Sequence, residues 1–557
     1  MFSPGRISKE TLIKQFILRN TSFLFLAVFL IVISNFLNLF LPLTVGWFYE
    51  IVFGDHGTKS SLLDLIPFDI KDRSSFFLFF GAILVFKTIL AFCEKYSIGV
   101  LSERFSRDLR EMAFQAQLNH TFNSHQLRPV GKYLLRYSGD LIAIQSLMSK
   151  GILVFFGDTC YLFLVLSVLF YINIQLAIPV VLLFSLSALV FFFLGNKLRE
   201  AALNRRTQRS LNLGFVSSRM HSFYTIKSFN RESPEQKSFL NRSAKLYKLS
   251  IDYTTISSLA KVLPSFFFFC ILGTVLYEIT AINSSSPFSK GDVFAFVLLL
   301  LYMQTVLKRL LKVNMVWQVG TISLHKLITL MNLPAESRPE EKATTAFSGA
   351  IAFNKVCFAY PDRQPIFKDL SFQIIPNTIS LIKGDQGFGK STLLKLIQNI
   401  YLPQNGEISF DGIPSSTFSP FEIRREITLV SDEAPLLGAT IFKAVSYTVS
   451  ENKKEKVLKM LKQLDIQLPC SEEEILQFKL NDGGKNISAG QRIKLQFARA
   501  FLTRKRIILI DNVFGNLDEK SLEIIGLFLN TLRKKRTILL VDQTKIPTLI
   551  IDQTIQL

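Results

Sequence analysis

One stretch in the second half of the chain has the residue types needed to hold phosphate. It reads Gly384-Asp385-Gln386-Gly387-Phe388-Gly389-Lys390-Ser391-Thr392 and fits the P-loop pattern of a glycine, four residues and then Gly-Lys-Ser. Glycines let a backbone adopt positive φ and approach a ligand closely, and backbone N–H groups at a helix N-terminus bind the anion. Lys390 is placed for the β- and γ-phosphates and the Ser391 hydroxyl for Mg²⁺. The stretch therefore predicts a magnesium–nucleotide site.

The segments on either side of this stretch are those that such a site requires. Residues 378–383 are apolar enough for a buried strand, and residues 392–400 carry apolar side chains at helical spacing. The alternative is a chance glycine-rich turn, against which the flanking strand and helix argue.

Composition separates this chain from ordinary soluble proteins. Of its 557 residues, 49% are hydrophobic and 53 are Phe, and the mean hydropathy is +0.32. The net charge of +21 is compatible with nucleic acid or with a membrane surface. The basic residues lie between long apolar runs, and no Lys/Arg tract or RNA-binding aromatic motif is present. This arrangement favours a membrane protein with basic cytoplasmic loops, and we expect no nucleic-acid partner.

The first 330 residues contain six apolar segments, each long enough to cross a hydrocarbon core of roughly 30 Å. We place the spans near residues 22–50, 74–97, 152–172, 174–196, 257–282 and 291–311. The N-terminus and the loops over 99–150 and 197–256 are rich in Lys and Arg. The positive-inside bias then predicts a multi-pass protein in the lipid bilayer, with both termini, both large loops and the C-terminal domain in the cytoplasm.

The two large loops read as helices that extend the membrane spans. Their turns are expected near residues 119–131 and 215–230, and the alternative is a pair of long solvated loops. A polar, Pro-containing linker covers 332–348, and from Gly349 the composition is that of a soluble α/β domain. The predicted domains are thus 1–331, the linker 332–348, and 349–557. The fold class is an all-α polytopic membrane domain, six transmembrane helices with long cytoplasmic extensions, followed by an α/β P-loop nucleotide-binding domain.

Further motifs flank the P-loop in a characteristic order. Phe358-Ala359-Tyr360-Pro361 precedes it, and Ile487-Ser488-Ala489-Gly490-Gln491, the apolar strand Ile507–Asp511 and Asn516-Leu517-Asp518 come after it. With these motifs the chain resembles a half-transporter of the ABC exporter superfamily over nearly its whole length. The resemblance implies that Tyr360 stacks on the adenine of ATP, that Asp511 ends the Walker B strand, and that Asp518 belongs to the D-loop.

The resemblance also implies a dimer. In the family two nucleotide-binding domains pair head to tail, and ATP lies between one P-loop and the other domain's signature motif. The residues that would bind ATP in this chain are Tyr360, Gly384, Gly387, Gly389, Lys390, Ser391 and Thr392. Those that would act on the partner's ATP are Ser488, Ala489, Gly490 and Gln491. Mg²⁺ would be held by Ser391, Asp511 and Asp432.

Three positions depart from the family pattern. Asn512 stands where the family has a Glu after the Walker B Asp, and a neutral amide cannot accept a proton from the attacking water. Gln543 stands where the H-loop His is expected; a shift of one residue would place Asp542 there instead. Asp432 occupies the Q-loop Gln position, from which a carboxylate could ligate Mg²⁺.

These departures predict a chain that binds ATP and hydrolyses it poorly in its own site. We expect it to be the degenerate half of a heterodimeric exporter, in preference to a homodimer, and to lend its signature motif to a competent partner site. A variant that still hydrolyses ATP slowly is the alternative for the site. A non-transporting regulatory or scaffold membrane protein is the alternative for the chain. The transported substrate is not predicted, and a bacterial-type inner or plasma membrane is expected.

Overall fold

The computed structural model describes residues 7–53, 73–126, 130–282, 290–336, 347–361, 363–385, 387–448, 454–469, 471, 474–481, 483–542 and 544–557. The chain forms two compact units. The first combines Met1–Asn119 with Gln126–Leu333, and the second combines His120–His125 with Pro334–Leu557. Of the linker expected over 332–348, residues 337–346 lie outside the described residues.

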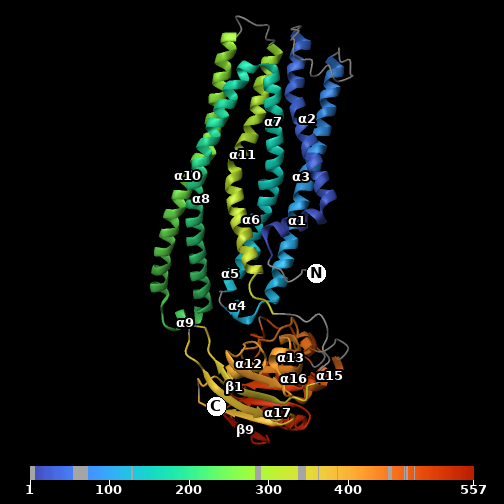
Figure 1. Ribbon diagram of the computed structural model, residues 1–557, viewed down its shortest axis with the longest axis vertical. Coiled ribbons are helices and arrows are strands. Elements are labelled where there is room, and N and C mark those ends of the chain that lie inside the picture. Colours follow the sequence, from blue (N-terminus) through green and yellow to red (C-terminus); the bar gives the residue numbers. More distant parts are fainter. Residues whose placement is uncertain are drawn as a thin grey trace. The chain divides into compact units, whose positions relative to one another are not determined.

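The first unit is helical (Figure 1). Six of its described helices are long and apolar enough to cross a membrane, which confirms the predicted number of spans. In chain order the helices are α1 (Lys9–Arg19), α2 (Thr21–Phe53), α3 (Arg73–Leu118), α4 (Phe122–Gln126, largely in the second unit), α5 (Val130–Leu135), α6 (Leu141–Ser146), α7 (Phe155–Ile172), α8 (Ile174–His221), α9 (Phe223–Ser228), α10 (Glu232–Ile282) and α11 (Lys290–Met331).

Several of these helices are longer than a membrane is thick. Helix α3 has 46 residues, α8 has 48 and α10 has 51. At 1.5 Å per residue they extend for about 70 Å or more, against roughly 30 Å of hydrocarbon. Each large loop is therefore built from helices that continue the spans, as predicted, and the short helices α4 and α9 lie within the two expected turns.

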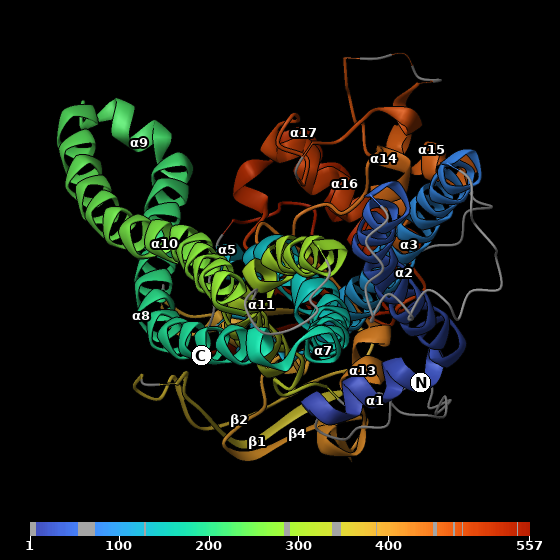
Figure 2. The same cartoon turned by 90° about the horizontal axis from the view of Figure 1, so that it is seen from above.

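Helices α8 and α10 lie side by side and are joined at one end by α9 (Figures 1 and 2). The hairpin between α7 and α8 turns at Asn173, where the side-chain Oδ1 accepts hydrogen bonds from Gln175 N at 2.8 Å and Leu176 N at 3.3 Å. An Asn at this position caps the new helix by satisfying N–H groups that have no partner within the helix.

The third span is not a uniform α-helix, which the sequence pattern did not reveal. Two π-helical stretches, Arg136–Asp140 and Leu147–Val154, interrupt it. Helix α11 approaches the second stretch closely, since a Cβ added at Gly320 would lie 2.5 Å from the Leu147 Cβ. The extra residue in a π-turn changes the direction of the side chains that follow it.

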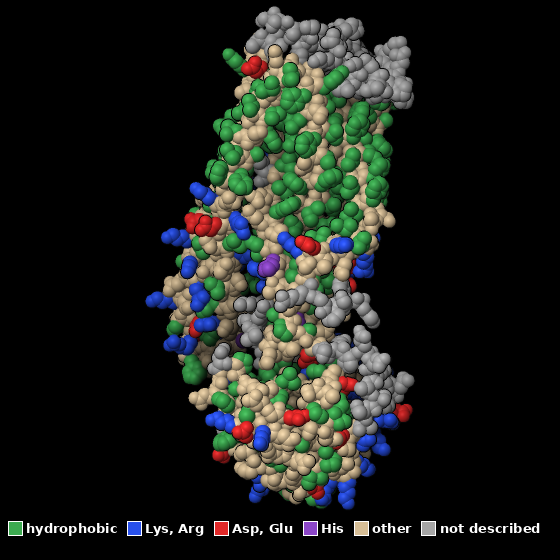
Figure 3. Space-filling view, in the orientation of Figure 1, with side chains coloured by type: hydrophobic (Ala, Val, Ile, Leu, Met, Phe, Trp, Pro, Cys, Tyr) green, Lys and Arg blue, Asp and Glu red, His purple; other side chains and the backbone are tan. Residues whose placement is uncertain are grey.

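Buried charges in the first unit are paired. Asp140 is 1% exposed and accepts hydrogen bonds from Arg136, from Arg206 of α8 and, at 2.9 Å, from the Ser323 hydroxyl of α11. Asp158 of α7 accepts from the Nε of Arg309 on α11 at 2.8 and 3.1 Å. In Figure 3 hydrophobic side chains cover much of the visible face of the long helices, whereas Lys and Arg gather toward one end of them.

The second unit contains two sheets. The four-stranded antiparallel sheet has the order β2-β1-β4-β5, and the five-stranded parallel sheet has the order β6-β7-β8-β3-β9. Strand bounds are β1 (Ile351–Phe358), β2 (Phe367–Ile374), β3 (Ile379–Lys383), β4 (Asn405–Phe410), β5 (Ile413–Pro414), β6 (Ile427–Ser431), β7 (Ile507–Asp511), β8 (Thr537–Val541) and β9 (Gln553–Gln556). The helices are α12 (Lys390–Ile397), α13 (Pro420–Glu426), α14 (Ile441–Val445), α15 (Lys454–Gln463), α16 (Ala489–Leu502) and α17 (Glu519–Leu532).

The parallel sheet places the functional loops on one edge. Every residue of β8, and all of β7 except Asp511, is buried, as expected for strands covered on both faces. The loops that follow parallel strands meet at the carboxyl edge of the sheet. The strand order therefore brings together the loop after β3 and the loops after β6, β7 and β8, which are far apart in the sequence.

Candidate nucleotide-binding site

The glycine-rich loop runs from the end of β3 to the first residue of α12. Gly387 and Gly389 have φ values of +93° and +81°, a region that L side chains rarely occupy and glycine adopts freely. A Cβ at Gly389 would also lie 2.4 Å from the Ile366 Cγ2. The loop therefore needs glycine at both positions, and it leads into the N-terminus of α12, the kind of helix end that binds anions.

Lys390 and Ser391 begin α12 and face the loop and the neighbouring strands. The Lys390 Nζ donates to the carbonyl oxygens of Gly384 at 2.7 Å and Asp385 at 2.8 Å, so the ammonium lies over the phosphate loop. The Ser391 Oγ donates to the Asp511 Oδ1 at 3.1 Å. A serine hydroxyl beside a carboxylate is an oxygen-donor pair that suits Mg²⁺.

Asp511 is the last residue of β7, two strands away from β3 in the sheet. Burial raises the pKa of its carboxyl above the ordinary value, although the Ser391 hydroxyl that donates to it acts in the opposite direction. A half-buried carboxylate without a cation is costly. The residues present fit Mg²⁺ with a triphosphate, because the ion would compensate this charge and the glycine loop would hold the phosphates.

Tyr360 follows β1 and lies beside α12. Its hydroxyl is 3.0 Å from the Thr392 Oγ1, and its ring packs edge to face against Tyr401 with a centroid separation of 5.2 Å. Within the second unit Tyr401 also contacts the Phe122 ring of α4, at 5.8 Å. The structure thus brings Tyr360, Lys390, Ser391, Thr392 and Asp511 together around one loop.

Asn512 follows Asp511 directly and has a φ of +48°. Its N–H donates to the carbonyl of Val541 at 2.7 Å, and its side chain is exposed. Asn tolerates the left-handed region better than Glu, because its short polar side chain can hydrogen-bond locally. The backbone here is therefore well suited to the residue that the sequence has.

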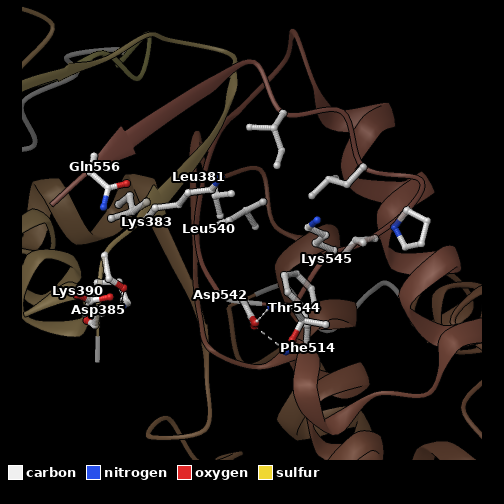
Figure 4. A pocket seen from close by; sticks show the side chains of 16 residues that line it. Leu381, Lys383, Asp385, Lys390, Phe514, Leu540, Asp542, Thr544, Lys545 and Gln556 are labelled. Atoms are coloured by element: carbon white, nitrogen blue, oxygen red, sulfur yellow. Dashed lines mark hydrogen bonds between the residues drawn. The ribbon is translucent and has the colours of Figure 1, made fainter. Parts of the chain in front are cut away.

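Asp542, at the end of β8, holds two backbone N–H groups. Its Oδ2 accepts from Phe514 N at 2.9 Å and its Oδ1 accepts from Thr544 N at 2.8 Å (Figure 4). Gln543, the predicted H-loop position, lies outside the described residues. Asp542 lines a cavity of about 600 Å³ whose wall also includes Lys390 and Asp385.

Asp432, in the loop after β6, is hydrogen-bonded to a residue that follows β7. Its Oδ2 accepts from the Nδ2 of Asn516 at 2.9 Å. The sequence placed Asp432 at the Q-loop position as a Mg²⁺ ligand and Asn516 in the D-loop motif, and it predicted no contact between them. Neither this bond nor that of Asp542 could be expected from sequence, because each joins loops that only the sheet order brings together.

Ser488 caps α16. Its Oγ accepts from Gln491 N at 3.1 Å, and the Gln491 Oε1 accepts from Ser488 N at 2.8 Å, which is a reciprocal capping box. A Cβ at Gly490 would lie 3.0 Å from the Asn516 carbonyl oxygen. Among the described residues no hydrogen bond joins Ser488–Gln491 to the glycine loop of the same chain. Asp518 stands at the N-cap position of α17 and accepts from the Ser521 hydroxyl, and this bond lowers its pKa.

The chain joins a helical unit that has six membrane-length helices to an α/β unit that has a phosphate loop. These features define an integral membrane protein with a nucleotide-binding domain. The family described as "ABC transporter transmembrane region" matches residues 24–307, and the family "ABC transporter" matches residues 367–515. The chain belongs to the ABC transporter family.

Similar proteins carry names of two kinds. The chain is 26% identical over 461 residues to "ATP-dependent lipid A-core flippase" of Burkholderia thailandensis, covering 82% of this chain and 77% of that protein. It is also 26% identical over 459 residues to "Multidrug resistance ABC transporter ATP-binding and permease protein" of Lactococcus lactis, covering 80% and 76%. Its fold matches "Structure of a bacterial Atm1-family ABC exporter with ATP bound" with a TM-score of 0.80 at 17% identity, covering 95% of this chain and 92% of that one.

Proposed function

We propose that this chain is the hydrolysis-poor half of a heterodimeric ABC exporter in a bacterial inner or plasma membrane, with both termini and the nucleotide-binding domain in the cytoplasm. The observation that carries the proposal is Asn512 beside an otherwise complete binding loop. Lys390, Ser391 and Asp511 have the contacts that ATP and Mg²⁺ need. The next residue has no group that accepts a proton.

The consequence for chemistry follows from the roles of these side chains. Lys390 neutralises charge on the β- and γ-phosphates, while Ser391 and Asp511 hold the ion that supplies further neutralisation. A Glu at position 512 would accept the proton of the attacking water; Asn512 leaves that proton on the water. Loss of a general base costs about 10²–10⁴-fold in rate. The bound nucleotide would then remain intact for much longer than one transport cycle.

The signature region supports a heterodimer over a homodimer. Ser488 and Gln491 form a reciprocal cap that orders the start of α16. The N-terminus of a helix is a site that can bind an anion. In a heterodimer these groups act on ATP held by a partner with its own Glu and His. In a homodimer both sites would lack the base. The retained Ser488–Gln491 cap would then contribute to hydrolysis in neither site.

The relatives suggest the class of substrate. One is named as a flippase for lipid A-core and the other as a multidrug resistance transporter. The first of these names specifies a lipid. We infer that this chain contributes to a pathway for an amphiphilic molecule. The six membrane-length helices favour this function over a non-transporting regulatory or scaffold protein.

The deciding experiment measures ATP binding and Mg²⁺-ATP turnover by the full chain in lipid nanodiscs, with proteins that copurify from the host identified. We expect binding without turnover, together with a copurifying half-transporter that carries the Glu and the His. Vectorial transport by that pair should be lost when Ser488 is replaced by Ala. Sustained turnover by a pure homodimer would contradict the proposal, and so would transport that does not respond to the Ser488 change.

A further inference from the structure

Four helices of the first unit bring ionisable side chains together within the membrane-length segments. Helix α2 packs against α3, α7 and α11, and α11 packs against α3 and α7 (Figures 1 and 2). Glu94 of α3 lies close enough to Asp158 of α7 and Arg309 of α11 to interact electrostatically with both. Ionisable groups inside membrane spans are costly, and they commonly mark the path of a substrate or an ion.

The charges of this cluster do not balance. The Nε of Arg309 donates to both carboxylate oxygens of Asp158, at 2.8 and 3.1 Å, and the Asp158 side chain is only 7% exposed. Among the described residues no Lys or Arg forms an ion pair with Glu94, and its neighbour Lys95 is exposed. Two carboxylates therefore share one guanidinium, and the cluster lacks one positive charge.

A buried hydroxyl beside the cluster also lacks a partner. Tyr161 is 3% exposed, and within the part of the chain that the structure describes its hydroxyl forms no hydrogen bond. It follows Asp158 by three residues and so lies on the same face of α7, and it interacts electrostatically with Arg309. Buried polar groups in native proteins normally bond to protein, water or a ligand. The Tyr161 hydroxyl is therefore available to a ligand at this cluster.

The helices are in close contact at this point. The Nδ2 of Asn35 on α2 donates to the carbonyl oxygen of Gly157 at 2.7 Å, and a Cβ added at Gly157 would lie 2.7 Å from the Ile31 Cγ2. The π-helical stretch Leu147–Val154 ends four residues before Asp158, and π-helical turns are frequent at functional sites. The backbone around Asp158 is thus held in place before a ligand binds, which lowers the cost of binding.

The same region already accommodates an ammonium group on an aromatic ring. The Nζ of Lys87 on α3 lies 5.3 Å from the centre of the Tyr302 ring of α11, which is within the range of a cation–π interaction. Tyr302 in turn interacts with Tyr161. Lys87 is seven residues from Glu94, or about 10 Å along the helix, and does not pair with it. Glu94 and Tyr161 remain available to a cation from another molecule.

We propose that Glu94 and the Tyr161 hydroxyl bind an ammonium group of an amphiphilic substrate, while Arg309 holds Asp158 in place. This inference rests on the proposed function and deepens it by naming the charge of the substrate. The Glu94 carboxylate supplies the missing counter-charge, and the Tyr161 oxygen accepts a hydrogen bond from the ammonium. The Arg309 side chain is 52% exposed, so the cluster is open on one side.

Two probes that differ only in charge test the proposal. The first is a dodecane diamine with a dansyl group on one nitrogen, which leaves one ammonium, and the second is the same molecule acetylated at that ammonium. Binding to the full chain in lipid nanodiscs is measured without nucleotide, and empty nanodiscs correct for partition into lipid. The ammonium probe should bind at least about tenfold more tightly, because hydrogen bonds to charged groups are the stronger ones.

Two variants locate the site. E94Q keeps the size of the side chain and removes its charge, so it should weaken binding of the ammonium probe by about 10–100-fold and leave the acetylated probe unchanged. Y161F removes only the hydroxyl and should weaken the ammonium probe by about 2–10-fold. E278Q makes the same change as E94Q in a different membrane-length helix, α10, and serves as the matched control that should bind both probes normally.

Equal affinity for the two probes, or an E94Q variant that binds the ammonium probe as tightly as the unmodified chain, would overturn the proposal. Tighter binding of a third probe that ends in a sulfate would assign the cluster to anions and overturn it as well. Unchanged affinity in Y161F would overturn the role of Tyr161. These measurements need neither ATP nor a partner. ATP turnover by a pure homodimer would therefore contradict the proposed function without affecting the binding result.

Discussion

The two halves of the nucleotide site differ in what their polar side chains contact. On the binding half, Lys390 bonds to carbonyl oxygens of the glycine loop and Ser391 bonds to Asp511. These side chains lie where they are expected to contact a phosphate and an ion. On the hydrolytic half, Asp432 and Asp542 bond to the turn after β7. The polar side chains of the first half surround the glycine loop, whereas the carboxylates of the second half are bonded to the turn after β7.

Under the proposed function, this difference would allow the site to lose hydrolysis while it keeps its affinity for ATP. The expected phosphate contacts come from one continuous stretch of nine residues, in which two glycines have the φ values that the loop requires. Hydrolysis depends on single residues from separate loops, and each can change without disturbing the fold. The following predictions test this contrast, from the largest expected effect to the smallest.

Restoring the hydrolytic residues should have the largest effect. N512E together with Gln543→His should raise Mg²⁺-ATP turnover of the dimeric chain by about 10²–10⁴-fold, because a general base then accepts the proton of water. Turnover in nanodiscs measures this. N512Q with Gln543→His is the matched control, because it has the size of Glu without the charge, and it should stay inactive. Absent turnover despite binding and dimerisation would show that the missing groups are not the cause.

Removing the lysine should weaken binding next most strongly. K390A should reduce ATP affinity by about 10–100-fold, since hydrogen bonds to charged groups contribute ~1.5–3 kcal/mol. Equilibrium binding of a fluorescent ATP analogue measures the loss. K368A, which removes an exposed lysine from β2, is the control and should bind normally. Equal affinities for K390A and K368A would break the contrast between the two halves.

Replacing Asp511 should reveal its shifted pKa. Burial raises the pKa of this carboxyl, so the folded chain favours the protonated form, and its stability falls as pH rises through that pKa. D511N lacks the carboxyl. Its unfolding midpoint should equal that of the unmodified chain below about pH 3, where the group is protonated in both states. Above that pKa the midpoint of D511N should be the higher one.

The same variant separates the ion from the nucleotide. D511N should lose the stabilisation that Mg²⁺ adds to ATP while keeping that of ATP in EDTA, since Asp511 is expected to contact the ion and Lys390 the phosphates. Thermal unfolding at pH 7 with each ligand measures this. A Mg²⁺ effect of undiminished size would exclude Asp511 as a ligand.

The helix cap should give the smallest effect. S488A should lower the free energy of unfolding of the second unit by about 0.5–2 kcal/mol, because Ser488 accepts the Gln491 N–H. S488D should retain the cap and the stability, yet repel an anion at the start of α16. Partner ATPase lost in both variants would show a role in ligand binding, whereas activity retained in S488D would reduce Ser488 to a structural cap.

Much of the fold followed from local patterns. Six apolar runs predicted six spans, and all six appear among the described helices. The alternation of basic loops and apolar runs predicted the helical extensions seen in α3, α8 and α10. The π-helical stretches could not be predicted, because Arg136–Asp140 forms where Asp140 bonds to α8 and α11, which are distant in sequence.

The nucleotide site likewise combines features that the sequence predicted with contacts that only the fold creates. The sequence by itself determined the glycine loop, its lysine and serine, and the missing Glu, because each is a matter of residue type at fixed spacing. Only the tertiary structure decided what Asp432 and Asp542 contact. Their partners come from loops that the order β6-β7-β8 places side by side. A hydrogen bond depends on distance in space, and a single sequence records distance only along the chain.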